Sequence, residues 1–343
     1  MAIQANEIKW YKSAVVNDTA SNGGTLSASE CLDGVKNNVW PDVSQAERLS
    51  GSIKYRKTFI KVANDDDLAL LNPLIFVETR TPGDDSIVLL PGTQTDTQAQ
   101  VTGYTRFYGA ASLDVHANPG DGTLLVNVEN GNGLGGHEIF RNGDLVRISD
   151  KSSVEDGSGN TELVRLAGSN AVAWNGNQAT LTLASGVLLA NAYLAAHTKV
   201  ASVIEADDIE ASVTNWSESS AAGTYDELTS PVHPDHIGSV EQNWTITFTG
   251  SSQFNCQGNT LGLVGTGSIG GGPFAPLNPD FNKPYFTLAD GLPPWGGSWV
   301  ATDTIHFTTH PAAVAVWEKR TVPAGANSHS GNKVVVAITG ESA

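Results

Sequence analysis

The chain has 343 residues, enough for two or three domains with separate cores, and 36 acidic against 19 basic residues give a net charge of −17. This balance argues against nucleic-acid binding, which needs clustered Lys and Arg. The sequence has no run of 18 apolar residues and no basic start followed by an apolar run, so we expect no membrane insertion, no secretory signal, and assembly in a cytoplasm.

The composition favours β-structure within a large assembly. Only 16% of the residues are charged, well below the usual quarter of a globular chain, and Gly, Asn, Thr, Ser and Ala take their place. Such turn-rich, weakly charged chains are typically all-β. Two cysteines, Cys31 and Cys256, are too few for a disulfide framework, and we expect them to be buried thiols.

The first third of the chain predicts a β-rich N-terminal domain over residues 1–115. Side chains alternate in type along Ser50–Asn64, which predicts a long strand. Residues Asn72–Gln94 predict two strands joined by a turn at Pro82–Asp85.

A small inserted β-barrel-like domain is predicted over residues 116–200. The Asn-Gly pair at 142–143 is a hairpin turn signal, because both residues tolerate positive φ. Short strands at this spacing are typical of a small barrel. The four predicted strands are Asp121–Gly131, Ile139–Asp150, Thr161–Gly168 and Asn177–Gly186. The segment Gly186–Asp208 is the best helical candidate in the chain, although only Leu188–Ala196 has strong helix formers, and the alternative is that it only links the domains.

Residues 201–343 predict a C-terminal β-sandwich. Trp244, Ile246 and Phe248 alternate with threonines, which gives one apolar face and one hydroxyl face. The predicted fold class is therefore all-β, with sandwich-type domains and an inserted small barrel-like domain.

His306 and His310 are spaced like two zinc ligands on one helix face. Their surroundings, "DTIHFTTHP", instead indicate a strand that ends at Pro311. On a strand the two Cα atoms lie about 13 Å apart, too far for one zinc ion. We therefore expect no metal site at this pair.

Other chemistry is weakly signalled. Glu155 and Asp156 precede Gly157, but Val154 stands where a calcium loop needs oxygen, so a surface turn is favoured over a bound cation. A pair of carboxylates that hydrolyses glycosidic bonds would come together only in the folded protein, and no sequence motif marks such a pair. No G-x-S-x-G elbow or phosphate loop is present. We expect a protein that is not an enzyme, with no catalytic residues, no metal and no cofactor.

Aromatic residues around a Pro/Gly loop offer a rival function. Tyr285, Trp295 and Trp299 are candidate glycan-contact side chains, because exposed aromatic rings can stack on sugars. The alternative is that the tryptophans belong to the core.

Two stretches carry distinctive patterns, Ile3–Val62 and Asn243–Ala326. The second contains the patterns D-x-I-x-F-x-T-x-P-A-A, from Asp303, and R-x-V-P-A-G-A, from Arg320. Both stretches resemble segments of virion structural proteins of tailed bacteriophages and prophages, a family to which we attach no activity. The resemblance covers about the first and the last 100 residues and leaves the middle domain out.

The resemblance implies a structural component of the tail, baseplate or neck that assembles with copies of itself and with other virion proteins. The loop Gly270–Pro279, with Phe274 and Pro276, is a candidate subunit contact. Two alternatives remain. One is a receptor- or carbohydrate-binding virion module that binds a host glycan, and the other is a head decoration protein.

Overall fold

The chain folds almost entirely into β-strands. The computed structural model describes residues 2–128, 139–291 and 293–343. Strands make up 46% of it and helices 4%, which confirms the predicted all-β fold. The described helices are short, namely η1 (Ala5–Glu7), α1 (Gln45–Ser50) and α2 (Gln98–Val101). None of the helices within the described ranges has the length and apolar character needed to cross a membrane.

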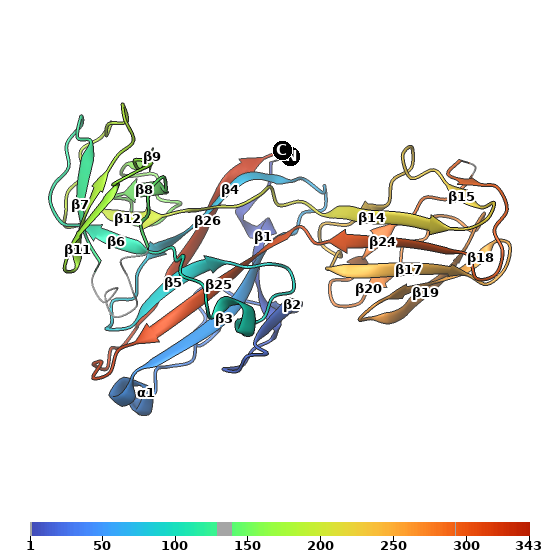
Figure 1. The fold of residues 1–343 in the computed structure, drawn as a ribbon, viewed down its shortest axis with the longest axis horizontal. Helices are drawn as coiled ribbons and strands as arrows, with labels where there is room; N and C mark the ends of the chain where they lie inside the picture. Colours follow the sequence, from blue (N-terminus) through green and yellow to red (C-terminus); the bar gives the residue numbers. More distant parts are fainter. Residues whose placement is uncertain (1, 129–138, 292) are drawn as a thin grey trace.

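Three units lie in a row along the long axis of the molecule, which we call the barrel unit, the central unit and the distal unit (Figure 1). The central unit consists of two sheets. Its five-stranded sheet has the order β2 (Gly23–Glu30), β1 (Ile8–Val15), β3 (Ser52–Val62), β25 (Ala313–Val322), β5 (Ser86–Pro91). Its three-stranded sheet has the order β13 (Ile204–Glu205), β4 (Leu70–Thr79), β26 (Val335–Ser342).

Strand β3 lies at the centre of the five-stranded sheet and is buried on both faces from Tyr55 to Val62. Phe59 and Ile60 point to opposite faces and are both fully buried. Ile60 packs with Phe76 and Val316 in the core between the two sheets of the central unit. The alternation seen in the sequence therefore does not separate a core face from a solvent face in this strand.

The last strands of the chain belong to the central unit. β25 pairs with β3 in ten consecutive register positions, from Ala313 opposite Lys61 to Val322 opposite Ser52, and β26 pairs with β4. The predicted range 201–343 therefore includes two strands that complete the sheets of the N-terminal region. The alternation of a strand indicates its inward face but carries no information about which strand is its neighbour.

The barrel unit is a seven-stranded sheet. Its order is β10 (Val172–Asn175), β11 (Gln178–Thr182), β7 (Thr123–Asn127), β6 (Ala110–Leu113), β12 (Lys199–Ser202), β8 (Leu145–Ser149), β9 (Thr161–Arg165). An isolated bridge between Leu166 and Leu183 joins the ends of β9 and β11 and curls the sheet back on itself.

The four strands predicted in the barrel are present as β7, β8, β9 and β11, except that residues 129–131 lie outside the described part of the chain. The helix predicted over Gly186–Asp208 is wrong, since turns and strands β12 and β13 occupy this range. Leu189 and Tyr193 pack into the barrel core instead, and their burial outweighs local helix propensity.

The distal unit comprises residues 212–310. Its five-stranded sheet has the order β14 (Ser212–Ser219), β24 (Thr304–His310), β17 (Gln242–Phe248), β18 (Gln253–Gly258), β19 (Gly262–Ser268). Short two-stranded ladders cover one face of this sheet. They are β15 (Thr224–Tyr225) with β23 (Trp295–Gly296), β16 (His233–Pro234) with β22 (Phe286–Thr287), and β20 (Leu277–Asn278) with β21 (Lys283–Pro284).

Buried polar contacts join the three units. Glu78 on β4 accepts hydrogen bonds from Arg147 on β8 at 2.5 Å and from Lys199 on β12 at 2.7 Å, which links the central and barrel units. At the other junction the fully buried Lys61 donates to the carbonyl of Ser239 at 3.1 Å. Charged groups that are buried in this way require partners, so each contact restrains the position of its neighbour.

Candidate functional site

His306 and His310 lie on strand β24, as the sequence predicted. The ring of His306 hydrogen-bonds Thr245 on the adjacent strand at 3.0 Å. Within residues 2–128, 139–291 and 293–343, no three or more His, Cys, Asp or Glu side chains come together in a way that could hold a metal ion.

The His310 ring connects a hydroxyl and a carboxylate, each at 2.8 Å: Thr214 on one nitrogen and Glu241 on the other. This order resembles the one in which hydrolases activate a nucleophile. Here the three side chains lie at the end of the sheet where β24 finishes at His310, and none of them lines the pocket described below. The arrangement fastens edge strand β14 and the residue before β17 to the end of β24.

The framework of the "DTIHFTTHP" segment is structural. Ile305, Phe307 and Thr309 point into the distal core. The Thr309 hydroxyl accepts a hydrogen bond from the indole of Trp244 at 2.8 Å and donates to the carbonyl of Val240 at 2.8 Å. The hydroxyl therefore both accepts and donates a hydrogen bond, as a buried polar group requires.

The prediction of sugar contacts at the aromatic loop requires correction, because its candidate side chains are buried. The exposed fractions are 5% for Tyr285, 3% for Trp295 and 2% for Trp299. The Trp299 ring lies flat on Phe248, with 4.2 Å between ring centroids. On another side of Trp299 the backbone of Gly223 approaches so closely that an added Cβ would lie 2.4 Å from the ring. These ring faces are covered by protein and cannot stack on a sugar.

The loop with Phe274 and Pro276 also packs inward. Phe274 is half-buried and meets Phe254 edge to face, with 5.3 Å between ring centroids, and Pro276 is buried. Leu277 beside them is 55% exposed. A subunit contact at this loop stays a prediction. A substitution of the exposed Leu277 tests it, because Phe274 and Pro276 pack inward.

The two free thiols are unreactive. Burial raises the pKa of Cys256 to about 12. Burial and the nearby carboxylate of Glu318 raise the pKa of the half-buried Cys31 to about 11. Both side chains remain protonated at neutral pH, and the thiolate is the nucleophilic form.

The acidic turn at Glu155 and Asp156 makes its hydrogen bonds locally. The carboxylate of Asp156 accepts from the hydroxyl of Ser152 at 2.5 Å and from the backbone N–H of Ser158 at 2.9 Å, and these bonds lower the pKa of Asp156. This is the bonding of a surface turn.

The side of the distal sheet that faces away from its core, which we call the outer face, carries mainly hydroxyl and amide side chains, with His306 and Leu263 among them. One row of directly paired residues crosses all five strands, with no charged member: Ser219, Thr304, Thr247, Asn255, Thr266. The next row contains Ser217, His306, Thr245, Gln257 and Leu263. The outer face therefore offers hydrogen-bond donors and acceptors without net charge.

A pocket of about 470 Å³ opens where the outer face reaches strand β19. Its polar side chains are those of Thr249, Gln253, Asn255, Thr266 and Ser268. Phe254, Phe274 and the chain at Gly271–Pro273 also line it. Among the residues that the structure describes, no Lys, Arg, His, Asp or Glu lines the pocket. Sequence reasoning missed it because its residues come from two strands and a loop.

One signal of this site was visible in the sequence. The segment 242–279 runs for 38 residues without a single Asp, Glu, Lys, Arg or His, in a chain of net charge −17. It contains β17, β18, β19 and the loop of the pocket.

Comparison of the chain with protein-family models gave no match, and comparisons with known proteins and with solved structures gave none either.

Proposed function

We propose that the chain is a structural component of a tailed-phage virion, in the tail, baseplate or neck. In this proposal it assembles in the bacterial host cytoplasm with copies of itself and with other virion proteins. It acts through these contacts and not through catalysis, and it binds no nucleic acid.

The position of the two resembling stretches supports this proposal. Strands β1 and β3 come from Ile3–Val62, and β25 comes from Asn243–Ala326. All three lie side by side in the five-stranded sheet. Parts of both segments that resemble virion proteins therefore share one sheet, the second segment also contributes β18, β19 and β24 of the distal unit, and the barrel unit lies between the two segments in the sequence.

The observation that carries the assembly proposal is the free edge of this sheet. Strand β2 pairs with β1 on one side, and on its other side an isolated bridge from Gly23 to Thr97 is its one recorded ladder contact within the described chain. Leu32 and Val35 follow directly and are 56% and 52% exposed. An open strand edge beside exposed apolar side chains is a site for pairing with another chain.

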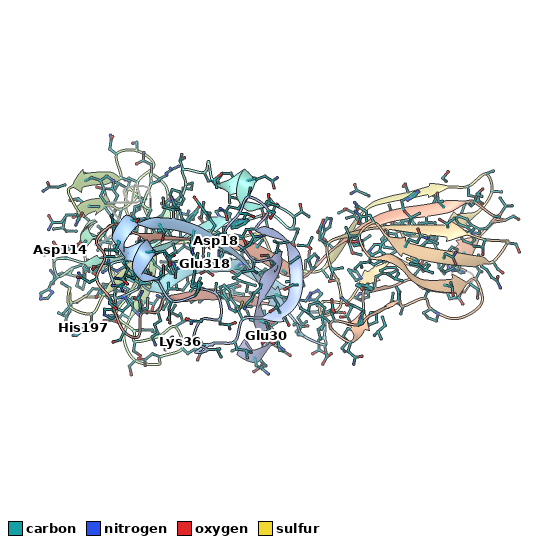
Figure 2. All side chains as sticks on the ribbon, turned by 90° about the horizontal axis from the view of Figure 1, so that it is seen from below. Asp18, Glu30, Lys36, Asp114, His197 and Glu318 are labelled. Carbon is teal, nitrogen blue, oxygen red and sulfur yellow. The ribbon has the colours of Figure 1, made fainter. Side chains whose placement is uncertain are left out.

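The proposed occupant of this edge is a second copy of the chain. Residues 1–62 contain eight Lys and Arg and six Asp and Glu, a net charge of +2, which leaves −19 for residues 63–343. Lys57 and Lys61 in this range are buried, and residues 23–43 along the edge carry Lys36 against Glu30, Asp33 and Asp42. The charge of the edge therefore does not select its occupant. Contacts between unlike surfaces close into rings when the rotation allows it. Figure 2 shows Glu30 and Lys36, which bracket the exposed segment, on the same side of the central unit.

The test is the size of the purified protein by sedimentation velocity. We expect concentration-dependent oligomers that Ala28→Lys and Leu32→Asp shift to monomer, since both place charge at the edge. Leu228→Asp is the matched control, because Leu228 is 89% exposed and lies in the distal unit. A wild-type chain that stays monomeric at high concentration and is missing from purified particles would contradict the proposal.

Copy number in purified particles separates the locations. Low multiples of three or six support a tail, baseplate or neck ring. Hundreds of copies would support the alternative of a head decoration protein.

A further inference from the structure

The pocket beside strand β19 has the chemistry of a binding site for an uncharged polar ligand. We propose that it binds a neutral saccharide unit of a glycan. The proposal concerns the distal unit and does not depend on the assembly of the central unit. It is separate from the buried Trp295 and Trp299, which have no free ring face.

Charge excludes several ligand classes. No cationic side chain of the described residues lines the pocket, and the chain carries a net charge of −17, so an anionic ligand would be repelled. No carboxylate lines the pocket either, so a cation finds no counter-charge. The side chains from the strands are mostly polar, which disfavours a purely apolar ligand. A neutral molecule rich in hydroxyl groups fits what remains.

Four of the five polar side chains that line the pocket make no hydrogen bond within the described part of the protein, and the fifth, the hydroxyl of Thr249, donates to the carbonyl of Gln253 at 3.2 Å. Within the described chain, no hydrogen bond to another protein group is recorded for the side chains of Gln253, Asn255, Thr266 or Ser268. Two amides and two hydroxyls can therefore donate and accept at the same time, which matches adjacent hydroxyl groups on a sugar ring. The situation differs at the opposite end of the outer face, where His306 bonds Thr245 and Thr308 bonds Asn243.

The loop beside the pocket is fixed. Phe274 packs edge to face on Phe254 on the core side of the sheet, whereas Asn255 and Thr266 point to the outer face, so polar groups dominate the pocket surface. The loop before Phe274 is braced by the carboxylate of Asp290, which accepts from the backbone N–H groups of Gly270 at 2.9 Å and Gly272 at 2.6 Å. The pocket is therefore formed before a ligand arrives, which lowers the entropic cost of binding.

The test is saturation-transfer NMR on the full-length protein. The probes are glucose, galactose, N-acetylglucosamine, maltose and lactose, with glucuronic acid and glucosamine as charged counterparts. We expect transfer to at least one neutral saccharide and much weaker transfer to both charged ones. Asn255→Ala and Gln253→Ala should each weaken binding about tenfold, the effect of one lost hydrogen bond with its partner left unpaired.

Gln257→Ala is the matched control, because Gln257 is an exposed amide on the same strand and does not line the pocket. Retained binding by this variant, with unchanged circular dichroism of all three variants, supports the pocket. Absence of transfer to every neutral probe, equal transfer to the charged probes, or equal losses in the Gln257 and Asn255 variants would overturn the inference. Since the oligomer size is measured separately, a chain that binds a sugar as a monomer contradicts only the assembly proposal.

Discussion

Lys57 and Asp96 form an ion pair inside the central unit, with 2.7 Å between Nζ and Oδ1 and side chains that are 0% and 5% exposed. The same carboxylate accepts a hydrogen bond from the indole of Trp317 at 3.0 Å, and Lys57 also donates to the carbonyl of Gly24 at 2.6 Å. Burial lowers the pKa of Lys57, and the partner Asp96 opposes this effect. The pair connects the loop before α2 to the face of the five-stranded sheet.

This pair predicts a non-additive loss of stability. Lys57→Met leaves a buried carboxylate without its counter-charge and should cost about 3–5 kcal/mol. Adding Asp96→Asn removes that charge and keeps an acceptor for Trp317, so the double variant should be more stable than the single one. Urea unfolding of the wild type and both variants measures this. A double variant that is less stable than Lys57→Met would refute the ion-pair interpretation.

Glu318 predicts a pH dependence. Its carboxylate accepts from the indole of Trp40 at 2.7 Å, and burial raises its pKa from 4.5 to about 7. Between these two values the unfolded chain releases the proton and the folded chain keeps it, so this group lowers stability as pH rises. Glu318→Gln keeps an acceptor for Trp40 and cannot ionise. We expect the stability of this variant relative to wild type to increase from pH 5 to pH 8 in urea unfolding.

Glu47 supplies the control with the opposite sign. Burial alone would raise its pKa, but hydrogen bonds from Ser44 and the ammonium of Lys54 lower it to about 2. The ionised carboxylate therefore stabilises the fold above its unfolded pKa, and the contribution is lost as pH falls toward 2. Glu47→Gln should cost more stability at pH 7 than at pH 3. If both glutamine variants change in the same direction with pH, the assignment to burial at Glu318 is wrong.

Trp299 distinguishes a core role from a sugar-binding role. Its ring is parallel to Phe248 within 10° and is almost fully buried, so Trp299→Ala should destabilise the distal unit by about 3–5 kcal/mol. Leu228→Ala, at a side chain that is 89% exposed, should change stability by less than about 0.5 kcal/mol. Thermal unfolding followed by tryptophan fluorescence gives both values. An unchanged midpoint for Trp299→Ala would show that the ring is dispensable to the core.

The sequence predicted what local patterns encode. The alternation of Trp244, Ile246 and Phe248 gave the inward face of β17, and "DTIHFTTHP" gave strand β24 in place of a helical metal grip. Strand neighbours were beyond reach, because alternation specifies a face and not a partner, so the return of β25 to the side of β3 was missed.

The candidate site was missed for a related reason. Whether Trp299 is exposed depends on Gly223 and Phe248, which are remote in sequence, and aromatic residues near glycines look alike in either case. The pocket joins β18, β19 and a loop, and its most informative sequence signal is the lack of charge over residues 242–279.

Lys61 predicts that the junction between the central and distal units limits stability at neutral pH. The side chain is fully buried, and burial lowers its pKa from 10.5 to about 7, opposed in part by Asp235. Between pH 7 and 10.5 the unfolded chain binds the proton and the folded chain releases it, so stability should rise with pH across this range. Lys61→Met replaces the ammonium that lies 5.3 Å from the centre of the Phe281 ring by an apolar thioether of similar length and removes the titration. We expect this variant to exceed wild type in unfolding free energy at pH 7 and to lose the advantage by pH 10.

Lys36→Met is the matched control, since the Lys36 side chain is 79% exposed. A Lys61→Met variant whose stability relative to wild type is constant from pH 7 to 10 would show that Lys61 stays charged in the folded protein.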